Sequence, residues 1–209
     1  MNRVFDYERP KEKDTFLISP VRGITDEEKD FLDDYVKHIE TTTGKGVHYP
    51  LYDTDQEDSI GLYICRQNRD GIRNSNDVSV YCNPTSNGSM FDLGMTFMAE
   101  KELKVINPVI LDGSNSPVAR FLRWYALSKF LNGDKEDMTA KVNRAWEIKD
   151  AAFVPLEFNG INPDFLFEFG MLFMAEKPLK LINRDEVKPT PYKSFENVLL
   201  HLDDLYRNS

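Results

Sequence analysis

A candidate for covalent chemistry is Asp92, which stands near the start of an expected helix in the segment Ser89-Met-Phe-Asp-Leu-Gly94. An acid in the first turn of a helix sits in the positive field of the helix N-terminus, which favours its ionised form. Backed by apolar side chains, such a carboxylate can attack an electrophilic carbon. Gly94 would let a strand or a ligand approach the helix closely. The alternative, equally open at this point, is that Asp92 only favours the helix start.

Three loops are expected to surround such a carboxylate, because ligands of open parallel sheets bind beyond the carboxyl ends of the strands. The loops are the stretches 19–23 and 83–89 and the region near Asp53. In the first of them, Arg22 and Gly23 are candidates for holding a phosphate group, since backbone amides and a single arginine can bind this group. A solvated loop arginine is the alternative.

A regular alternation of strands and helices carries these loops. Short apolar runs at 15–19, 47–51, 77–82 and 103–106 are typical of buried strands, and Thr25-Asp-Glu-Glu28 is a capping box that opens a helix. The alternation predicts an α/β protein with a flavodoxin-like or Rossmann-like parallel sheet and helices on both faces. Pro155 would confine a strand over 153–158 to an edge or a bulge. Further helices are expected at 60–73, at 89–101, from 116 to 133, up to about 148, and from 194.

An internal repeat is the most informative pattern. Residues 91–107 and 167–183 align without a gap at an offset of 168 − 92 = 76, and 12 of the 17 positions are identical. We therefore expect a helix-strand-helix-strand unit to occur twice in one compact body. Residues 1–110 would form the first unit and residues 111–209 a partial second copy, which either extends the first sheet or docks against it.

Composition excludes several classes of function. The net charge is −9, with 35 acidic and 26 basic residues, which argues against a nucleic-acid surface. The two cysteines and the isolated histidines show no spacing typical of disulfide frameworks, metal sites or catalytic triads, so neither a metal nor a cofactor is expected. The chain has no apolar run of the ~20 residues that span a bilayer and no signal peptide, so no membrane partner and a cytoplasmic location are expected.

Two segments, Asn68-Arg-Asp-Gly-Ile-Arg-Asn-Ser-Asn-Asp-Val-Ser-Val-Tyr81 and Ser86-Asn-Gly-Ser-Met-Phe-Asp-Leu-Gly-Met95, resemble the core of nucleoside 2-deoxyribosyltransferases. The resemblance covers roughly residues 15–107, with the segment Phe16-Leu-Ile-Ser-Pro20 in its expected place. It implies that Asp92 stands at the position of the nucleophilic glutamate of the family. Ser86 stands where the family often has an aspartate, and Asn68 where some members have a base-binding aspartate. The substrate-binding candidates are then Ser19, Arg22, Gly23, Asn68, Asn83, Ser86 and Ser89.

The second copy carries a related motif. Asn162-Pro-Asp-Phe-Leu-Phe-Glu-Phe-Gly170 looks like the same helix start with a glutamate, Glu168, in place of the aspartate. It also resembles the helix-start signature of TIR-like nucleotide glycohydrolases over a much shorter stretch. That resemblance implies Glu168 as a second candidate catalytic residue. The alternative is an acid retained from the duplication.

Both resemblances imply chemistry at the N-glycosidic bond of a nucleoside or nucleotide, the small molecule expected as partner. A carboxylate stabilises or captures C1′ while the base departs through an oxocarbenium-like transition state, and a second base or water then completes the reaction. Related transferases complete their sites with a neighbouring subunit, a contribution that the second copy could make in cis; a homo-oligomer is left open. The alternatives are an NAD-type glycohydrolase centred on Glu168 and a nucleotide-binding module without turnover.

Overall fold

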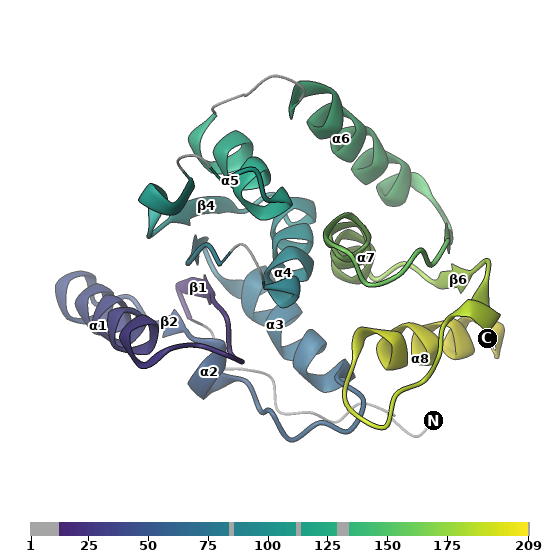
Figure 1. Ribbon diagram of the computed structural model, residues 1–209, viewed down its shortest axis with the longest axis horizontal. Coiled ribbons are helices and arrows are strands. Elements are labelled where there is room, and N and C mark those ends of the chain that lie inside the picture. The colour runs from purple at the N-terminus through teal and green to yellow at the C-terminus, as the bar shows by residue number, and fades with distance from the viewer. Residues whose placement is uncertain (1–12, 84–85, 112–113, 129–133, 209) are drawn as a thin grey trace.

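The computed structural model describes residues 13–83, 86–111, 114–128 and 134–208 (Figure 1). Its larger sheet has four parallel strands in the order β2-β1-β3-β4. These strands are β1 (Thr15–Ile18), β2 (Val47–His48), β3 (Asp77–Val80) and β4 (Glu102–Val105). The parallel α/β architecture predicted from the sequence is confirmed.

Helices cover both faces of this sheet, as the alternation of side chains along β1 shows. Leu17 packs in a small cluster with Leu32 of α1 (Asp26–Thr43), whereas Phe16 and Ile18 belong to the main core. Successive side chains of a strand point to opposite faces, so one strand serves two layers. The main core lies under α3 (Leu62–Asn74) and α4 (Asn87–Met98).

The second strand is shorter than the expected run to residue 51. It ends at His48, and the short helix α2 (Pro50–Asp53) follows with Pro50 in its first turn. Proline suits this position because its missing N–H would have no partner there and its fixed φ matches the helix. Helix α1 begins as predicted, with Thr25 and Glu28 forming both hydrogen bonds of the capping box.

The rest of the chain is mostly helical and contributes a separate sheet. Its elements are η1 (Pro108–Leu111), α5 (Pro117–Leu127), α6 (Asp134–Asp150), β5 (Val154–Leu156), α7 (Pro163–Ala175), β6 (Leu179–Leu181), η2 (Arg184–Glu186) and α8 (Phe195–Arg207). Within the described residues, strands β5 and β6 pair with each other alone, in parallel. Of the two arrangements expected, the second copy therefore docks against the first. Pro155 lies in this edge strand, as predicted, and its carbonyl accepts a hydrogen bond from Arg144.

The repeat holds element by element in three dimensions. Shifted by 76 residues, α3, β3, α4 and β4 fall on α6, β5, α7 and β6. Asn107 hydrogen-bonds both backbone groups of Cys82 at 2.7 and 3.0 Å, and Asn183 does the same to Phe158 at 2.8 and 2.7 Å. The equivalence continues beyond the similar sequences, because η1 and η2 also begin 76 residues apart and α5 packs on β4 as α8 packs on β6. We call α3 to α5 the first copy and α6 to α8 the second copy, so that α5, which the expected boundary at residue 110 assigned to the second copy, belongs to the first.

The two copies meet where α4 and α7 lie side by side at the centre of the molecule (Figure 1). A Cβ added to Gly94 would come within 2.1 Å of the Phe167 carbonyl oxygen, and one added to Gly170 would come equally close to that of Phe91. Both the glycines and the phenylalanines are repeat equivalents, so the contact is reciprocal, like the self-complementary interface of a two-fold dimer. Gly94 thus admits a helix, where a strand or a ligand was expected.

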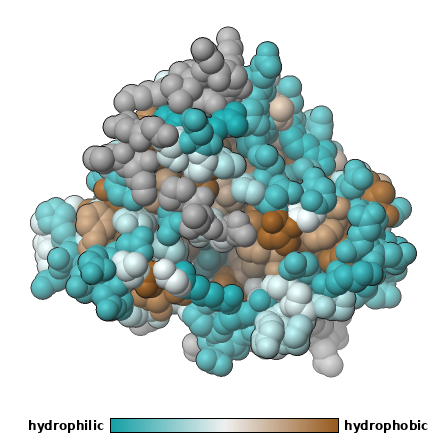
Figure 2. Space-filling view, in the orientation of Figure 1, coloured by the Kyte–Doolittle hydropathy of each residue, from teal (hydrophilic) through white to brown (hydrophobic). Residues whose placement is uncertain are grey.

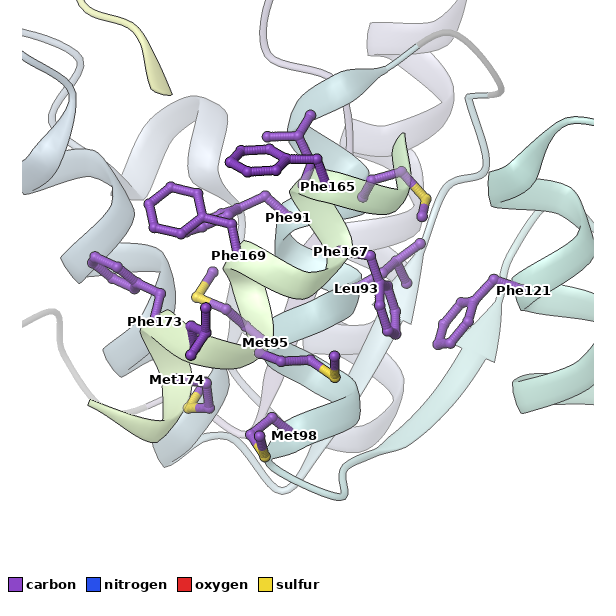
Figure 3. Packing of buried hydrophobic residues seen from close by; sticks show 14 of the residues in the cluster. Phe91, Leu93, Met95, Met98, Phe121, Phe165, Phe167, Phe169, Phe173 and Met174 are labelled. Carbon is purple, nitrogen blue, oxygen red and sulfur yellow. The ribbon is translucent and has the colours of Figure 1, made fainter. Parts of the chain in front are cut away.

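Aromatic side chains surround this helix crossing. Phe91, Phe169 and Phe173 lie on one side of the pair, while Phe167 points from α7 towards Phe121 of α5 on the other side (Figure 3). The ring centroids of Phe121 and Phe167 are 4.8 Å apart. In the corresponding place, Phe195 of α8 lies 5.0 Å from Phe91. The last helix of each copy therefore packs beside the central helix of the other.

Candidate functional site

A cavity of about 400 Å³ lies at the carboxyl edge of the larger sheet, and we call it the Asp92 cavity. Its walls come from the loop after β1, the start of α3, the start of α4 and the start of α8. It contains most of the residues that the sequence suggested, namely Ser19, Arg22, Asn68, Ser86, Ser89 and Asp92. Gly23 and Asn83 lie in the adjoining loops and do not line it.

Asp92 is only 8% exposed, and burial raises the pKa of its carboxyl to about 7. The Asn68 amide, whose nitrogen lies 3.4 Å from each carboxyl oxygen, lowers that pKa and offsets the effect of burial only in part. Helix α4 begins at Asn87, two residues before the expected start, so Asp92 lies beyond its first turn. The helix field falls off within that turn. The expectation that the helix start would favour the ionised form is therefore wrong.

Two hydroxyl groups in the cavity wall are buried and have no hydrogen-bond partner among the residues described. They belong to Ser19, which is 8% exposed, and Ser89, which is 2% exposed. Buried polar groups nearly always have a partner, so these two hydroxyls are suited to a ligand or a water molecule. Ser86 has a different role, because its hydroxyl caps α4 by accepting the Ser89 N–H at 3.3 Å.

Two cations stand in the wall of the cavity. Arg22 projects from the loop after β1, and Lys193 precedes α8 and donates a hydrogen bond to the Gln56 carbonyl. Sequence reasoning had singled out Arg22 but neither Lys193 nor Gln56. Ser194 was recognised as a helix start, and it does cap α8. The start of α8 reaches the first copy only because α4 and α7 pack reciprocally, and nothing in the local sequence indicates that packing.

Glu168, the repeat equivalent of Asp92, does not line this cavity. Its side chain is 31% exposed and accepts a hydrogen bond from the Arg144 Nε at 2.7 Å. Arg144 is in turn the repeat equivalent of Asn68, since 144 − 68 = 76. The same pair of positions thus holds a buried acid with a neutral amide in the first copy and a salt bridge in the second.

The difference between the copies extends to other residues of the cavity wall. Five residues that line the cavity have charged repeat equivalents, so that Gly61, Cys65, Asn68, Gly88 and Asp92 correspond to Asp137, Lys141, Arg144, Asp164 and Glu168. The Lys141 ammonium group lies 2.8 Å from Asp137 and 3.1 Å from Asp164. Four of the five are uncharged in the first copy and leave space there, whereas ion-paired side chains occupy the second copy.

Other kinds of site find little support in the part of the chain described. No group of three or more histidine, cysteine, aspartate or glutamate residues is arranged to hold a metal ion there. Among these residues, no helix is long and apolar enough to cross a bilayer. Hydrophilic side chains predominate on the face shown in Figure 2, with apolar patches between them. Cys65, in the cavity wall, is a free thiol whose pKa is raised by burial.

Comparisons of the chain with protein-family models, with curated proteins and with solved structures find no match.

Proposed function

We propose that the protein acts on the N-glycosidic bond of a nucleoside or nucleotide, by 2-deoxyribosyl transfer or by hydrolysis, with Asp92 as the reacting carboxylate. One observation carries the proposal: a buried carboxyl group faces a cavity and is paired with a neutral amide, from Asn68. A carboxylate without a permanent counter-ion is available to the positive charge that develops at C1′ as the base departs. A low-dielectric site strengthens that attraction.

The protonation of Asp92 sets when it can react. With a pKa of about 7, the carboxyl group is partly ionised near neutral pH and fully ionised above it. The ionised form is the nucleophile, so the rate should rise as the pH rises through this range. A developing positive charge at the sugar would itself favour the ionised form.

The cavity favours a phosphorylated substrate. Arg22 and Lys193 supply positive charge, and the unpartnered hydroxyls of Ser19 and Ser89 supply hydrogen bonds. The start of α4 adds backbone N–H groups, a common way to bind phosphate. A cavity of about 400 Å³ is within the size range of small-molecule sites. These features support a nucleoside 5′-monophosphate as the preferred substrate.

A glycohydrolase centred on Glu168 has less support, because Arg144 already neutralises that carboxylate. A nucleotide-binding module without turnover would use the same Asp92 cavity. Its distinguishing property is a bound ligand that remains intact.

The proposal is tested by incubating the protein with deoxynucleosides, their 5′-monophosphates and NAD, each with and without a free acceptor base. Products are separated by chromatography. New nucleoside that forms only with acceptor indicates transfer, and free base without acceptor indicates hydrolysis. Asp92→Asn should abolish either reaction, whereas Glu168→Gln, the matched change in the second copy, should leave it intact. Loss of activity in Glu168→Gln alone would transfer the assignment to Glu168, and no base release from any substrate would contradict the proposal.

A further inference from the structure

Four buried side chains form a continuous chain of hydrogen bonds that ends at Asp92. Asn68 donates to the Asp92 carboxyl, and its own carbonyl oxygen accepts from the Thr54 hydroxyl at 3.0 Å. The Thr54 oxygen lies 3.1 Å from Nε2 of His48. None of the four side chains is more than 9% exposed. Water therefore has little access to these four side chains, and each of them depends on its neighbours in the hydrogen-bond chain.

When Asp92 is ionised, the number of protons available fixes the direction of these hydrogen bonds. Thr54 has one hydroxyl proton and gives it to Asn68, so His48 must donate its Nε2 proton to the Thr54 oxygen. Burial lowers the pKa of His48 to about 4, so the ring is neutral near pH 7 and carries one proton. In this direction the Asn68 amide presents its NH₂ group to Asp92.

The opposite direction is possible only with a different protonation state of Asp92. If Thr54 donated to His48, the Asn68 NH₂ group would donate to Thr54 and the Asn68 carbonyl oxygen would face Asp92. That oxygen can bond the Asp92 carboxyl only when the carboxyl carries a proton. The direction of the chain and the ionisation of Asp92 are therefore coupled.

We propose that Thr54 and His48 are positioning residues, which hold the Asn68 amide with its NH₂ group towards Asp92 and thereby keep the buried carboxylate ionised and ready to react. The inference rests on the proposed function only in taking Asp92 as the reacting group. The hydrogen-bond chain itself is independent of the substrate.

The elements that supply the chain are present only in the half of the protein that has the cavity. His48 lies in β2, and Thr54 directly follows α2. Both elements precede the first copy, and the described part of the second copy is preceded by no such pair. There Arg144, which stands in place of Asn68, reaches Glu168 directly. A charged partner needs no third residue to orient it, whereas an amide, which can face either way, does.

Packing fixes the far end of the chain as well. The ring of Phe16 stacks on His48, with centroids 5.0 Å apart and planes inclined by 12°. A Cβ at Gly71 would lie within 2.8 Å of the Phe16 ring, so glycine at this position of α3 leaves the space that the stacked pair requires. The stacking therefore holds the plane of the imidazole, and Nε2 lies 3.1 Å from the Thr54 oxygen.

Other charged groups also act on the two ends of the chain. Arg22 and Lys193 line the same cavity as Asp92, and Cys65 on α3 is its titratable neighbour. Asp53 and Lys13 influence the ionisation of His48, in opposite directions. The test must therefore interrupt the hydrogen-bond chain without changing these charged groups. Replacing Thr54 with the nearly isosteric valine does this.

The experiment measures the Asp92 pKa in the whole folded protein by NMR titration of ¹³C-labelled aspartate, with Asp92→Asn identifying the signal. Thr54→Val should raise the Asp92 pKa by about one unit, the size expected when one hydrogen bond to a carboxylate is lost. Thr54→Ser, which keeps the hydroxyl, should restore it. Thr96→Val is the matched control, because the buried Thr96 hydroxyl bonds only the Asp92 backbone carbonyl and leucine stands at the equivalent position 172.

An Asp92 pKa that is unchanged in folded Thr54→Val, or shifted equally in Thr96→Val, would overturn the inference. Two variants of His48 repeat the test at the other end of the hydrogen-bond chain. His48→Gln keeps an N–H donor and should leave the Asp92 pKa unchanged, whereas His48→Met lacks a donor and should raise it. Where turnover is found, Thr54→Val should lose about tenfold in kcat/KM at acidic pH and recover it at alkaline pH. A pKa that moves as expected in a protein without turnover supports the chain and contradicts the proposed function alone.

Discussion

Replacing Asp92 with asparagine is expected to raise the free energy of unfolding at pH values above 7 while it removes the reacting carboxylate. Burial raises the pKa of this group from its usual 3.8 to about 7. Between these values the native protein binds more protons than the unfolded chain, so stability falls as the pH rises through the window. About three units at 1.36 kcal/mol each give an upper limit of about 4 kcal/mol for the cost of the charge.

The Asp92→Asn variant escapes this cost, because an amide of the same size cannot ionise and can still hydrogen-bond Asn68. The stability gained should be close to zero near pH 4 and grow by about 1.4 kcal/mol per pH unit up to pH 7. Urea unfolding at a series of pH values measures it directly. Glu168→Gln is the matched control, since Glu168 is partly exposed and paired with Arg144, and its loss should change stability by no more than about 1 kcal/mol.

A variant that is less stable than the parent protein at pH 8, or a difference that does not grow with pH, would refute the reasoning. The result bears on function because it separates the two interpretations of Asp92. An acid that only supports the helix start would destabilise the protein when replaced. An acid whose removal stabilises the fold is explained by what it does for a ligand or a reaction.

Three further outcomes are expected. Gly170→Ala should lower the free energy of unfolding by about 3 kcal/mol or more, because its Cβ would meet the Phe91 carbonyl at 2.1 Å, whereas Gly88→Ala, in open space, should leave the thermal midpoint nearly unchanged. Ser89→Ala should reduce kcat/KM about tenfold for a nucleoside 5′-monophosphate and little for the nucleoside, in steady-state assays. Calorimetry should find one nucleotide bound per chain, and two equivalent sites would contradict the view that ion pairs occupy the second copy.

The sequence predicted the framework well because that framework depends on local patterns. The short apolar runs of β1, β3 and β4, which alternate with helices, are typical of strands in a parallel sheet, and the capping box at Thr25 depends on residues three apart. The duplication was visible because 12 of 17 aligned positions are identical, and the helix crossing explains one of them, the glycine at positions 94 and 170. Pro50, by contrast, ended the second strand earlier than its apolar neighbours suggested.

The electrostatic state of the site could not be predicted in the same way. The pKa of Asp92 depends on how completely α3 and the other walls exclude water, which is a property of tertiary packing. Spacing alone placed Asp92 in the first helical turn and therefore gave the shift the wrong sign. Lys193 escaped notice for a related reason, because it lies more than one hundred residues from Arg22 and joins it only through the packing of the two copies.

The reciprocal contact of α4 and α7 explains why a single cavity needs both copies. It brings α8 of the second copy to the first, where Gly61 lies against Ser194 and Val198. The same contact brings α5 of the first copy to the second, where Arg120 lies 3.7 Å from Asp137, the repeat equivalent of Gly61. Gly61 leaves room for a ligand beside α8, whereas the Arg120–Asp137 salt bridge ties α5 to the second copy. The symmetry of the backbone thus gives each copy a covering helix, and the side chains decide which of the two covers an open site.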